Sequence, residues 1–204
     1  MNDYQFIAPF YDFLLGPFMR SIRRDVLYKV LHLQPKNVLD VACGTGDQLR
    51  LLTQKNIDAV GVDMSEAMLK ICRKSNPSSD CLLQDATDMA FQRGRFSLAM
   101  ISFALHETDW ESANGILDEI HRVLMPSGHL LVVDYSDFRK TPFYTRQAIR
   151  MIEFMAGKRH FRNFRTYHRN GGLNALVKEH RFHPVTSTHR ASRSIAIRLY
   201  QRLA

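Results

Sequence analysis

The sequence of 204 residues is poor in cysteine and has no apolar run long enough to cross a membrane. Its three cysteines, Cys43, Cys72 and Cys81, are too few and too scattered for a disulfide scaffold or a zinc ribbon, which favours a reduced, cytoplasmic setting. The first residues include an acid and lack a long apolar core, so we expect no secretory signal. With 45% hydrophobic and 24% charged residues, the composition predicts one globular domain over residues 1–204.

Acidic residues are scarce in the last third of the chain. Residues 1–138 hold 13 Lys and Arg against 18 Asp and Glu, whereas residues 139–204 hold 15 against 2, namely Glu153 and Glu179. The overall charge of +8 therefore divides into −5 and +13. A basic third indicates an anionic partner, substrate or surface near that end, although a solvated basic face explains the charge equally well.

Through the first two thirds of the chain, apolar runs typical of strands alternate with stretches whose apolar residues have helical spacing. We expect strands at 37–41, 59–62, 81–84, 96–101 and 129–134. Helices are expected at 11–31, 48–54, 66–74 and 110–124, with Gly16-Pro17 breaking the first turn of the first helix and the turn at 125–128 ending the last. This alternation predicts an α/β fold with a Rossmann-like, doubly wound, mostly parallel sheet and helices on both faces.

The last third is expected to fold differently. Its spacing predicts a helix at 141–158, a basic connector at 160–170 and a short helix at 171–180. Two strands near 183–188 and 194–200, joined by a short turn, predict an antiparallel hairpin that completes a seven-stranded sheet.

The segment VLDVACGTGD, residues 38–47, reads as a buried strand followed by a tight glycine turn and a helix. It lacks the third glycine of the dinucleotide fingerprint, since Leu49 occupies that position. Asp47 places a negative charge at the helix start, where a phosphate would be repelled. Both features disfavour NAD, FAD and nucleotides, and favour a ligand that is neutral or cationic at this loop.

Acids fall at the tips of the first three expected strands: Asp40, Asp63 and Asp85. An acid after the second strand can accept both ribose hydroxyls, as it does in dinucleotide folds. An acid after the third can accept a hydrogen bond from an exocyclic amine such as that of adenine. Together they predict an adenosine pocket without a phosphate cradle.

Five segments in this order and spacing resemble class I S-adenosylmethionine-dependent methyltransferases: VLDVACGTGD, VGVDMSEAML, LLQDATDM, FSLAMISFALHET and HRVLMPSGHLLVVDY. The resemblance is to the small-molecule branch, which includes ubiquinone and menaquinone C-methyltransferases and phospholipid N-methyltransferases. It implies a lid helix within 1–35, a cofactor-binding core at 36–138, a substrate cap at 139–170, and a last helix and hairpin at 171–204. Met125 and Ser127 replace the usual lysine and glycine of one turn.

The resemblance also implies S-adenosyl-L-methionine as cofactor, S-adenosyl-L-homocysteine as product, and a set of cofactor-binding positions. Gly44, Gly46, Ala42 and Cys43 would surround the methionine part, with Asp40 and Ser102 near its amino group. The adenosine part would be held by Asp63 at the ribose, Met64 over the adenine face, and Asp85 with Ala86 at the adenine amine. Tyr11 on the lid helix is expected to line the same site.

His106, just after the fourth strand, is the candidate general base, with Glu107 as an orienting or second acid. A structural role for His106 is the alternative. Tyr4 and Tyr135 could also line the substrate pocket. The remaining histidines show no clean metal-ligand spacing, so no metal is assigned.

The expected partner is a small molecule that is aromatic, quinol-like or lipid-like and carries an anionic group. The aromatic and basic residues of 139–170 suit such an acceptor, or contact with an anionic membrane at the inner face, or plain helix packing. RNA methylation is an alternative motivated by the segment HFRNFRTYHR, although SFALHE is not the motif used for methylation of bases and nucleic acid is not the favoured partner. A non-catalytic protein that binds S-adenosylmethionine is a further alternative. Oligomeric state and acceptor atom stay open.

Overall fold

The computed structural model describes the backbone of residues 4–203 and the side chains of residues 19–203, and in this part of the chain seven strands form one sheet. The strands are β1 (Val38–Val41), β2 (Ala59–Asp63), β3 (Asp80–Leu83), β4 (Phe96–Ser102), β5 (Leu124–Tyr135), β6 (Phe182–Arg190) and β7 (Ile195–Arg202). The helices are α1 (Tyr4–Leu33), α2 (Asp47–Thr53), α3 (Glu66–Ser75), α4 (Trp110–Val123), the 3-10 turn η1 (Phe138–Lys140), α5 (Phe143–Met155), α6 (Lys158–Arg169) and α7 (Gly172–Glu179).

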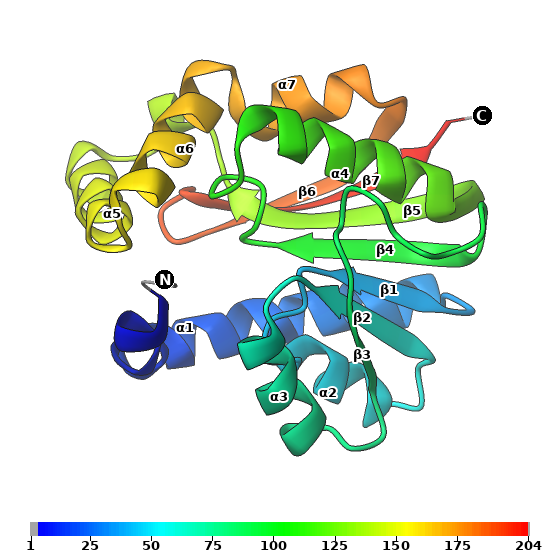
Figure 1. The fold of residues 1–204 in the computed structure, drawn as a ribbon. Helices are drawn as coiled ribbons and strands as arrows, with labels where there is room; N and C mark the ends of the chain where they lie inside the picture. The colour runs from blue at the N-terminus through cyan, green and yellow to red at the C-terminus, as the bar shows by residue number, and fades with distance from the viewer. Residues whose placement is uncertain (1–3, 204) are drawn as a thin grey trace.

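The strand order across the sheet is β3-β2-β1-β4-β5-β7-β6 (Figure 1). Strands β1 to β5 pair in parallel, and β7 runs antiparallel between β5 and β6. The order reverses between β1 and β4, and in open α/β sheets a ligand binds where the order reverses, beyond the carboxyl ends of the strands. The predicted Rossmann-like sheet with an antiparallel C-terminal hairpin is confirmed.

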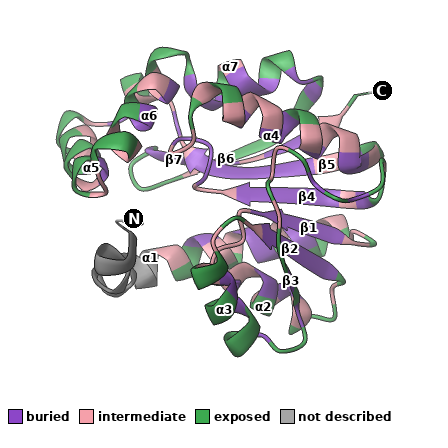
Figure 2. Cartoon of the chain, in the orientation of Figure 1, coloured by how far each residue is buried: buried purple, intermediate pink, exposed green. Residues whose placement is uncertain are grey.

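Helices cover both faces of the sheet. The apolar core forms one layer on each face of the sheet, because successive side chains of a strand point to opposite faces. Leu130 and Val132 of β5 pack in the layer under α4 and α7, whereas Leu131 and Val133 pack in the layer under α1, α2 and α3. Figure 2 shows the central strands buried between these two sets of helices.

The helices α5 and α6 lie at the end of the sheet toward which β4 points (Figure 1). They follow β5 through η1, and they bring the segment 139–170 over the carboxyl ends of the parallel strands. That edge is where the sequence places the predicted ligand site.

Three element predictions are wrong. The helix α1 continues through Gly16 and Pro17, which is possible because an internal proline removes only one backbone hydrogen bond from a long helix. The expected turn at 125–128 lies inside β5, as a register shift with Ser127 in the left-handed region. The expected connector at 160–170 is the helix α6, whose buried Asn163, Phe164 and Tyr167 recur at helical spacing.

The expectation of reduced cysteines is also wrong for one pair, because a disulfide joins Cys72 on α3 to Cys81 on β3. Their Cα atoms lie 6.6 Å apart, and Cys43 stays a free thiol. A search of the described helices finds none that combines the length and the apolarity needed to cross a membrane.

Candidate active site

The glycine turn after β1 is held by backbone hydrogen bonds. The Cys43 N–H donates to the Val62 carbonyl and the Gly46 N–H donates to the Cys43 carbonyl, each at 3.0 Å. Gly46 has φ +74°, and a Cβ there would come within 2.9 Å of the Asn76 side-chain nitrogen. Gly44 has φ +54°, but a Cβ there would meet no atom within 4 Å. The turn therefore packs tightly at Gly46 and leaves open space beside Gly44.

That open space belongs to a cavity of about 360 Å³, which falls within the usual size of small-molecule sites. Five parts of the chain line it: α1, the stretch from β1 through the glycine turn to the start of α2, α3, the end of β4, and the residue after α5. The lining includes Met19, Ile22, Arg23, Val26, Asp40, Ala42, Cys43, Gly44, Asp47, Ser102, Phe103 and Ala156. Of the predicted cofactor residues, the structure thus gathers Asp40, Ala42, Cys43, Gly44 and Ser102 at one cavity.

The cavity lining holds two acids, Asp40 and Asp47, and one base, Arg23. Asp40 is buried, and burial together with the neighbouring Asp63 raises the pKa of its carboxyl to about 7, against the lowering influence of Arg23. Arg23 pairs with Asp47 at 3.0 Å, and Arg50 lies 3.6 Å from the same carboxylate. Asp47 is thus partly neutralised, which weakens the sequence argument that it repels phosphate. A cation next to Asp40 would favour the ionised carboxylate.

Asp63 lies outside the cavity lining but fixes its loop. Its Oδ2 accepts a hydrogen bond from the Gly44 N–H at 2.8 Å, and its Oδ1 accepts one from the Ser65 N–H at 2.8 Å. Each carboxylate oxygen can accept a second bond. The side chain is therefore positioned at the tip of β2 with capacity left for ligand hydroxyls.

The remaining predicted cofactor residues, Gly46, Met64, Asp85 and Ala86, are also outside the cavity lining. The Met64 side chain is 70% exposed. Asp85 Oδ1 accepts bonds from the Thr87 N–H and hydroxyl, at 2.8 and 2.7 Å, and these two bonds lower the pKa of the Asp85 carboxyl. Tyr4 and Tyr11 fall outside the described side chains.

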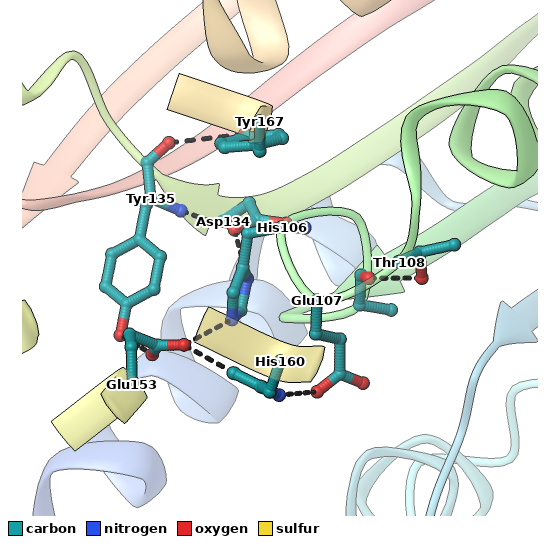
Figure 3. A network of polar contacts seen from close by, with 9 residues as sticks. His106, Glu107, Thr108, Asp134, Tyr135, Glu153, His160 and Tyr167 are labelled. Carbon is teal, nitrogen blue, oxygen red and sulfur yellow. Dashed lines mark hydrogen bonds and ion pairs between the residues drawn. The ribbon is translucent and has the colours of Figure 1, made fainter. Parts of the chain in front are cut away.

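A second cluster surrounds His106, at the ends of β4 and β5 (Figure 3). His106 Nδ1 lies 2.7 Å from Asp134 Oδ1, and both residues are buried. Its Nε2 lies 3.7 Å from Glu153 Oε2, which is too long for a hydrogen bond. The Tyr135 hydroxyl donates to Glu153 Oε1 at 2.7 Å, and His160 Nε2 bonds Glu153 Oε2. Asp134 lies on β5 and His106 in the loop after β4, and the helices α5 and α6 supply Glu153 and His160.

Burial alone would lower the pKa of His106, but the carboxylates outweigh it. Asp134 acts by charge and by hydrogen bond, followed by Glu153 and Glu107, and together they raise the pKa of His106 to about 9. Burial would raise the pKa of Glu153, but the His160 bond and the His106 charge bring it below its usual range. The geometry describes an imidazole paired with an acid and shielded from water, which can accept a proton from a weak acid.

Glu107 lies at the outer side of this cluster, with its Oε2 3.4 Å from His160 Nδ1. His106, Glu107 and His160 each bring one ligand atom within 4.8 Å of the others, close enough to hold a metal ion. The absence of a metal stays a prediction.

His106 does not itself line the cavity, but it follows Phe103, which does, by three residues in the sequence. Ser102 and Phe103 precede it on the same strand end, and Ala156 follows Glu153 by three residues. The chain after β4 and the end of α5 therefore contribute residues to both sites.

Comparison with known proteins relates this site to one enzyme family. Residues 38–128 match the family described as a methyltransferase domain. A demethylmenaquinone methyltransferase of Thermus thermophilus is 33% identical over 166 residues, which cover 74% of each chain. The chain belongs to the class I S-adenosylmethionine-dependent methyltransferases.

Two further proteins are similar to this methyltransferase. A demethylmenaquinone methyltransferase of Renibacterium salmoninarum is 32% identical over 142 residues, which cover 68% of this chain and 59% of the relative. The matched part thus spans between 59% and 74% of these two curated relatives. The crystal structure of a Pyrococcus horikoshii protein has a TM-score of 0.70 at 18% identity and covers 91% of both chains, which shows the shared fold.

The cavity of this methyltransferase suits S-adenosylmethionine, the methyl donor of its family. The space beside Gly44 is wide enough for a ligand chain, and the acidic Asp40 suits a sulfonium or ammonium group. Met19, Ile22 and Val26 of α1 supply an apolar wall opposite the glycine turn. These three residues were not among the predicted site residues, although the helix that carries them was predicted as a lid.

Sequence reasoning also missed Asp134, Glu153 and His160 of the His106 cluster. Asp134 ends the apolar run LLVVD, as Asp40 and Asp63 end theirs, so the strand-tip rule that found those acids could have found it. Glu153 is the single acid among nine Lys and Arg in residues 139–170, which is a signal of its own. His160 was assigned to the connector that is in fact α6.

Proposed function

We propose that this methyltransferase transfers a methyl group from S-adenosylmethionine to a small, apolar, quinol-type acceptor that carries a phenolic hydroxyl. The observation that best supports this proposal is the buried His106–Asp134 pair. The pKa of the His106 imidazole, about 9, lies near the pKa of a phenol, which is about 10. A base and an acid of similar pKa exchange a proton with little energetic cost. The demethylmenaquinone methyltransferases among the relatives support a quinone-type acceptor.

We further propose how the residues divide the work. Asp40, Ala42, Cys43, Gly44 and Ser102 hold the methionine part of the donor, and Asp63, Met64, Asp85 and Ala86 hold the adenosine part. When bound, the donor supplies an electrophilic methyl group, so the chain has to orient the acceptor and to exclude water. Phe103 and Ala156 line the cavity where the loop after β4 and the end of α5 reach it, and the acceptor would lie between this side and the donor.

His106 accepts the proton of the acceptor hydroxyl at Nε2, whose 3.7 Å distance from Glu153 leaves its hydrogen bond available. Asp134 holds the ring by Nδ1 and stabilises the imidazolium that forms. The deprotonated acceptor would use the freed electron pair to form the bond to the methyl carbon, and the electron pair of the broken sulfur–methyl bond would stay on the sulfur. Glu107 and Glu153 flank the proton acceptor as further negative charges.

The pH profile of methyl transfer tests this function. Because His106 must be neutral to accept a proton, kcat/KM for a demethylquinol should rise with pH through a midpoint near pH 9. Asp134→Asn removes the largest contribution that raises the pKa, so the rise should move to lower pH and the plateau should fall by about 10²–10⁴-fold. A profile that is flat between pH 7 and pH 9 in the native chain contradicts the assignment.

His106→Ala separates turnover from cofactor binding. We expect a loss of about 10²–10⁴-fold in kcat, while calorimetry gives a dissociation constant for S-adenosylhomocysteine within about twofold of the native value. Equal losses in rate and in cofactor affinity would overturn the division between His106 and the cavity.

Chelation distinguishes proton acceptance from a metal held by His106, Glu107 and His160. The proposed mechanism requires that EDTA followed by dialysis leaves kcat within about twofold. A complete loss that added Mg²⁺, Mn²⁺ or Zn²⁺ restores would assign the cluster to a metal ion instead.

A further inference from the structure

The helix α5 exposes an unusual number of large apolar side chains. Their exposed fractions lie between 57% and 73%, and they belong to Phe143, Tyr144, Met151, Phe154 and Met155. Residues of these types are normally buried, and a contiguous exposed group marks an interaction surface. We propose that the outer face of α5 and α6 binds the surface of a membrane rich in anionic lipid.

The five side chains lie on one side of the helix. At 3.6 residues per turn they fall within an arc of about 120°, and the buried Ile149 and Glu153 lie on the opposite side. An apolar arc on an exposed helix, opposite a side that packs on the protein, is the arrangement by which helices lie in the plane of a membrane interface. Figure 2 shows α5 at the rim of the molecule with most of its surface exposed.

The exposed charges that α5 and α6 themselves carry have one sign, although Asp109, an exposed acid just before α4, lies near Arg159. Arg150, Lys158, Arg159, Arg162, Arg165 and Arg169 are all exposed. The single acid of residues 139–170 is Glu153, which is 2% exposed and bonded inside the His106 cluster. The surface of α5 and α6 therefore presents cations without exposed acids. This complements anionic headgroups, which attract Lys and Arg near a membrane surface.

The apolar arc of α5 lies next to a cavity residue along the chain. The apolar arc ends at Met155, and the next residue, Ala156, lines the cavity. The helix α5 would therefore stand between a membrane bound to the arc and the cavity, because the arc lies opposite the side that packs on the protein. The inference goes beyond the proposed function, because membrane binding can be measured without any methyl donor or acceptor.

The test is co-sedimentation of the purified full chain with vesicles. Equal parts of phosphatidylcholine and phosphatidylglycerol provide the anionic surface, and phosphatidylcholine alone provides the neutral one. We expect binding to the anionic vesicles to be at least about tenfold tighter, and to weaken in about 1 M salt, where the Debye length is about 3 Å. Sedimentation that is equal on both vesicles, or absent on both at low salt, overturns the proposal.

Two paired variants assign the binding to this face. Tyr144→Ser with Met151→Ser should weaken anionic-vesicle binding about tenfold, whereas Val185→Ser, an exposed apolar residue on β6, should leave it unchanged. Arg150→Glu with Arg162→Glu should weaken it at low salt, whereas Lys55→Glu, exposed after α2, should not. Equal effects of the face variants and of their controls would overturn the assignment to α5 and α6.

A fluorescence readout reports depth without relying on affinity. Tyr144→Trp should shift its emission to shorter wavelength when anionic vesicles are added, whereas Val185→Trp should show no shift above the Trp110 background. RNA binding with a steep salt dependence but no vesicle binding would assign the face to nucleic acid. A dimer that dissociates on Tyr144→Ser with Met151→Ser, without vesicle binding, would assign it to a second copy of the chain. Either result overturns the proposal.

Discussion

Asp40 is a buried carboxylate at the tip of β1 whose pKa of about 7 makes it sensitive to the charge of a ligand. Burial, followed by the neighbouring Asp63, disfavours the ionised form, and a positive ligand group would restore it. The pKa of the Cys43 thiol is also raised, by burial and then by Asp40 and Asp63, so this cysteine stays protonated and unreactive. We therefore expect Asp40 to act on the ligand through its charge, whereas Cys43 only packs against its neighbours.

Cofactor binding should depend on pH through Asp40. The carboxylate attracts the ammonium group of S-adenosylhomocysteine only when ionised, so affinity should rise as pH rises through about 7. We expect calorimetry to show an increase of about tenfold between pH 6 and pH 8, with proton release near pH 7.

Asp40→Asn should bind weakly at every pH and should lose this dependence. The exposed acid Asp58 offers the matched control, because Asp58→Asn should keep the native pH profile. A pH dependence that survives in Asp40→Asn would show that another group titrates.

Asp63→Ala should weaken S-adenosylhomocysteine binding about ten- to hundredfold in calorimetry. The carboxylate makes charge-assisted bonds worth about 1.5–3 kcal/mol each, and it also fixes the Gly44 N–H beside the cavity. Asp58→Ala serves again as the surface control. Native affinity in Asp63→Ala would remove this residue from the proposed site.

The acids at the strand tips were predictable because they follow a pattern that is visible in the local sequence. An apolar run that ends in an acid marks a carboxyl end of the sheet, and Asp40, Asp63 and Asp85 follow it. The distances between side chains were not predictable. Glu153 reaches His106 only because α5 folds back over β4, which is a tertiary contact between residues 47 positions apart.

The cap helices α5 and α6 are the elements that complete the His106 cluster. Glu153 on α5 bonds His160 on α6 and Tyr135 at the end of β5, so one side chain links three elements. The sequence predicts a helix in α5 from apolar spacing, but it does not predict α6. The segment HFRNFRTYHR carries Asn163, Phe164 and Tyr167 at helical spacing among many basic residues. The contacts of Phe164 with the Tyr135 and Phe138 rings are tertiary and cannot be read from the sequence.

Glu153→Gln tests the contribution of the cap to the base. Because Glu153 raises the pKa of His106 less than Asp134 does, the rise of kcat/KM should move to lower pH by less than in Asp134→Asn. Glu179→Gln, which changes an exposed acid on α7, should leave the profile in place. A larger shift in Glu153→Gln than in Asp134→Asn would reverse the assigned order of the two acids.

At the scale of the whole molecule, the sheet separates two apolar layers that must form together. The sequence predicted the layered α/β architecture, because strands and helices alternate with the required spacing. It predicted the antiparallel hairpin from the short turn between its strands. It did not predict that β7 inserts between β5 and β6, a pairing set by contacts across the chain.

Two adjacent residues of β5 test whether the layers fold as one unit. Leu130 packs in the layer under α4 and α7, Leu131 packs in the layer under α1 to α3, and both are fully buried. Leu130→Ala and Leu131→Ala should each lower the free energy of unfolding by about 2–5 kcal/mol, because each leaves a cavity in a closed layer. Leu203→Ala, at a side chain that is 48% exposed, should change it by no more than about 0.5 kcal/mol. Urea unfolding followed by circular dichroism should give one transition in all three variants, since the two layers share every central strand. Two separate transitions, with only one of them shifted by each variant, would show that the layers unfold independently.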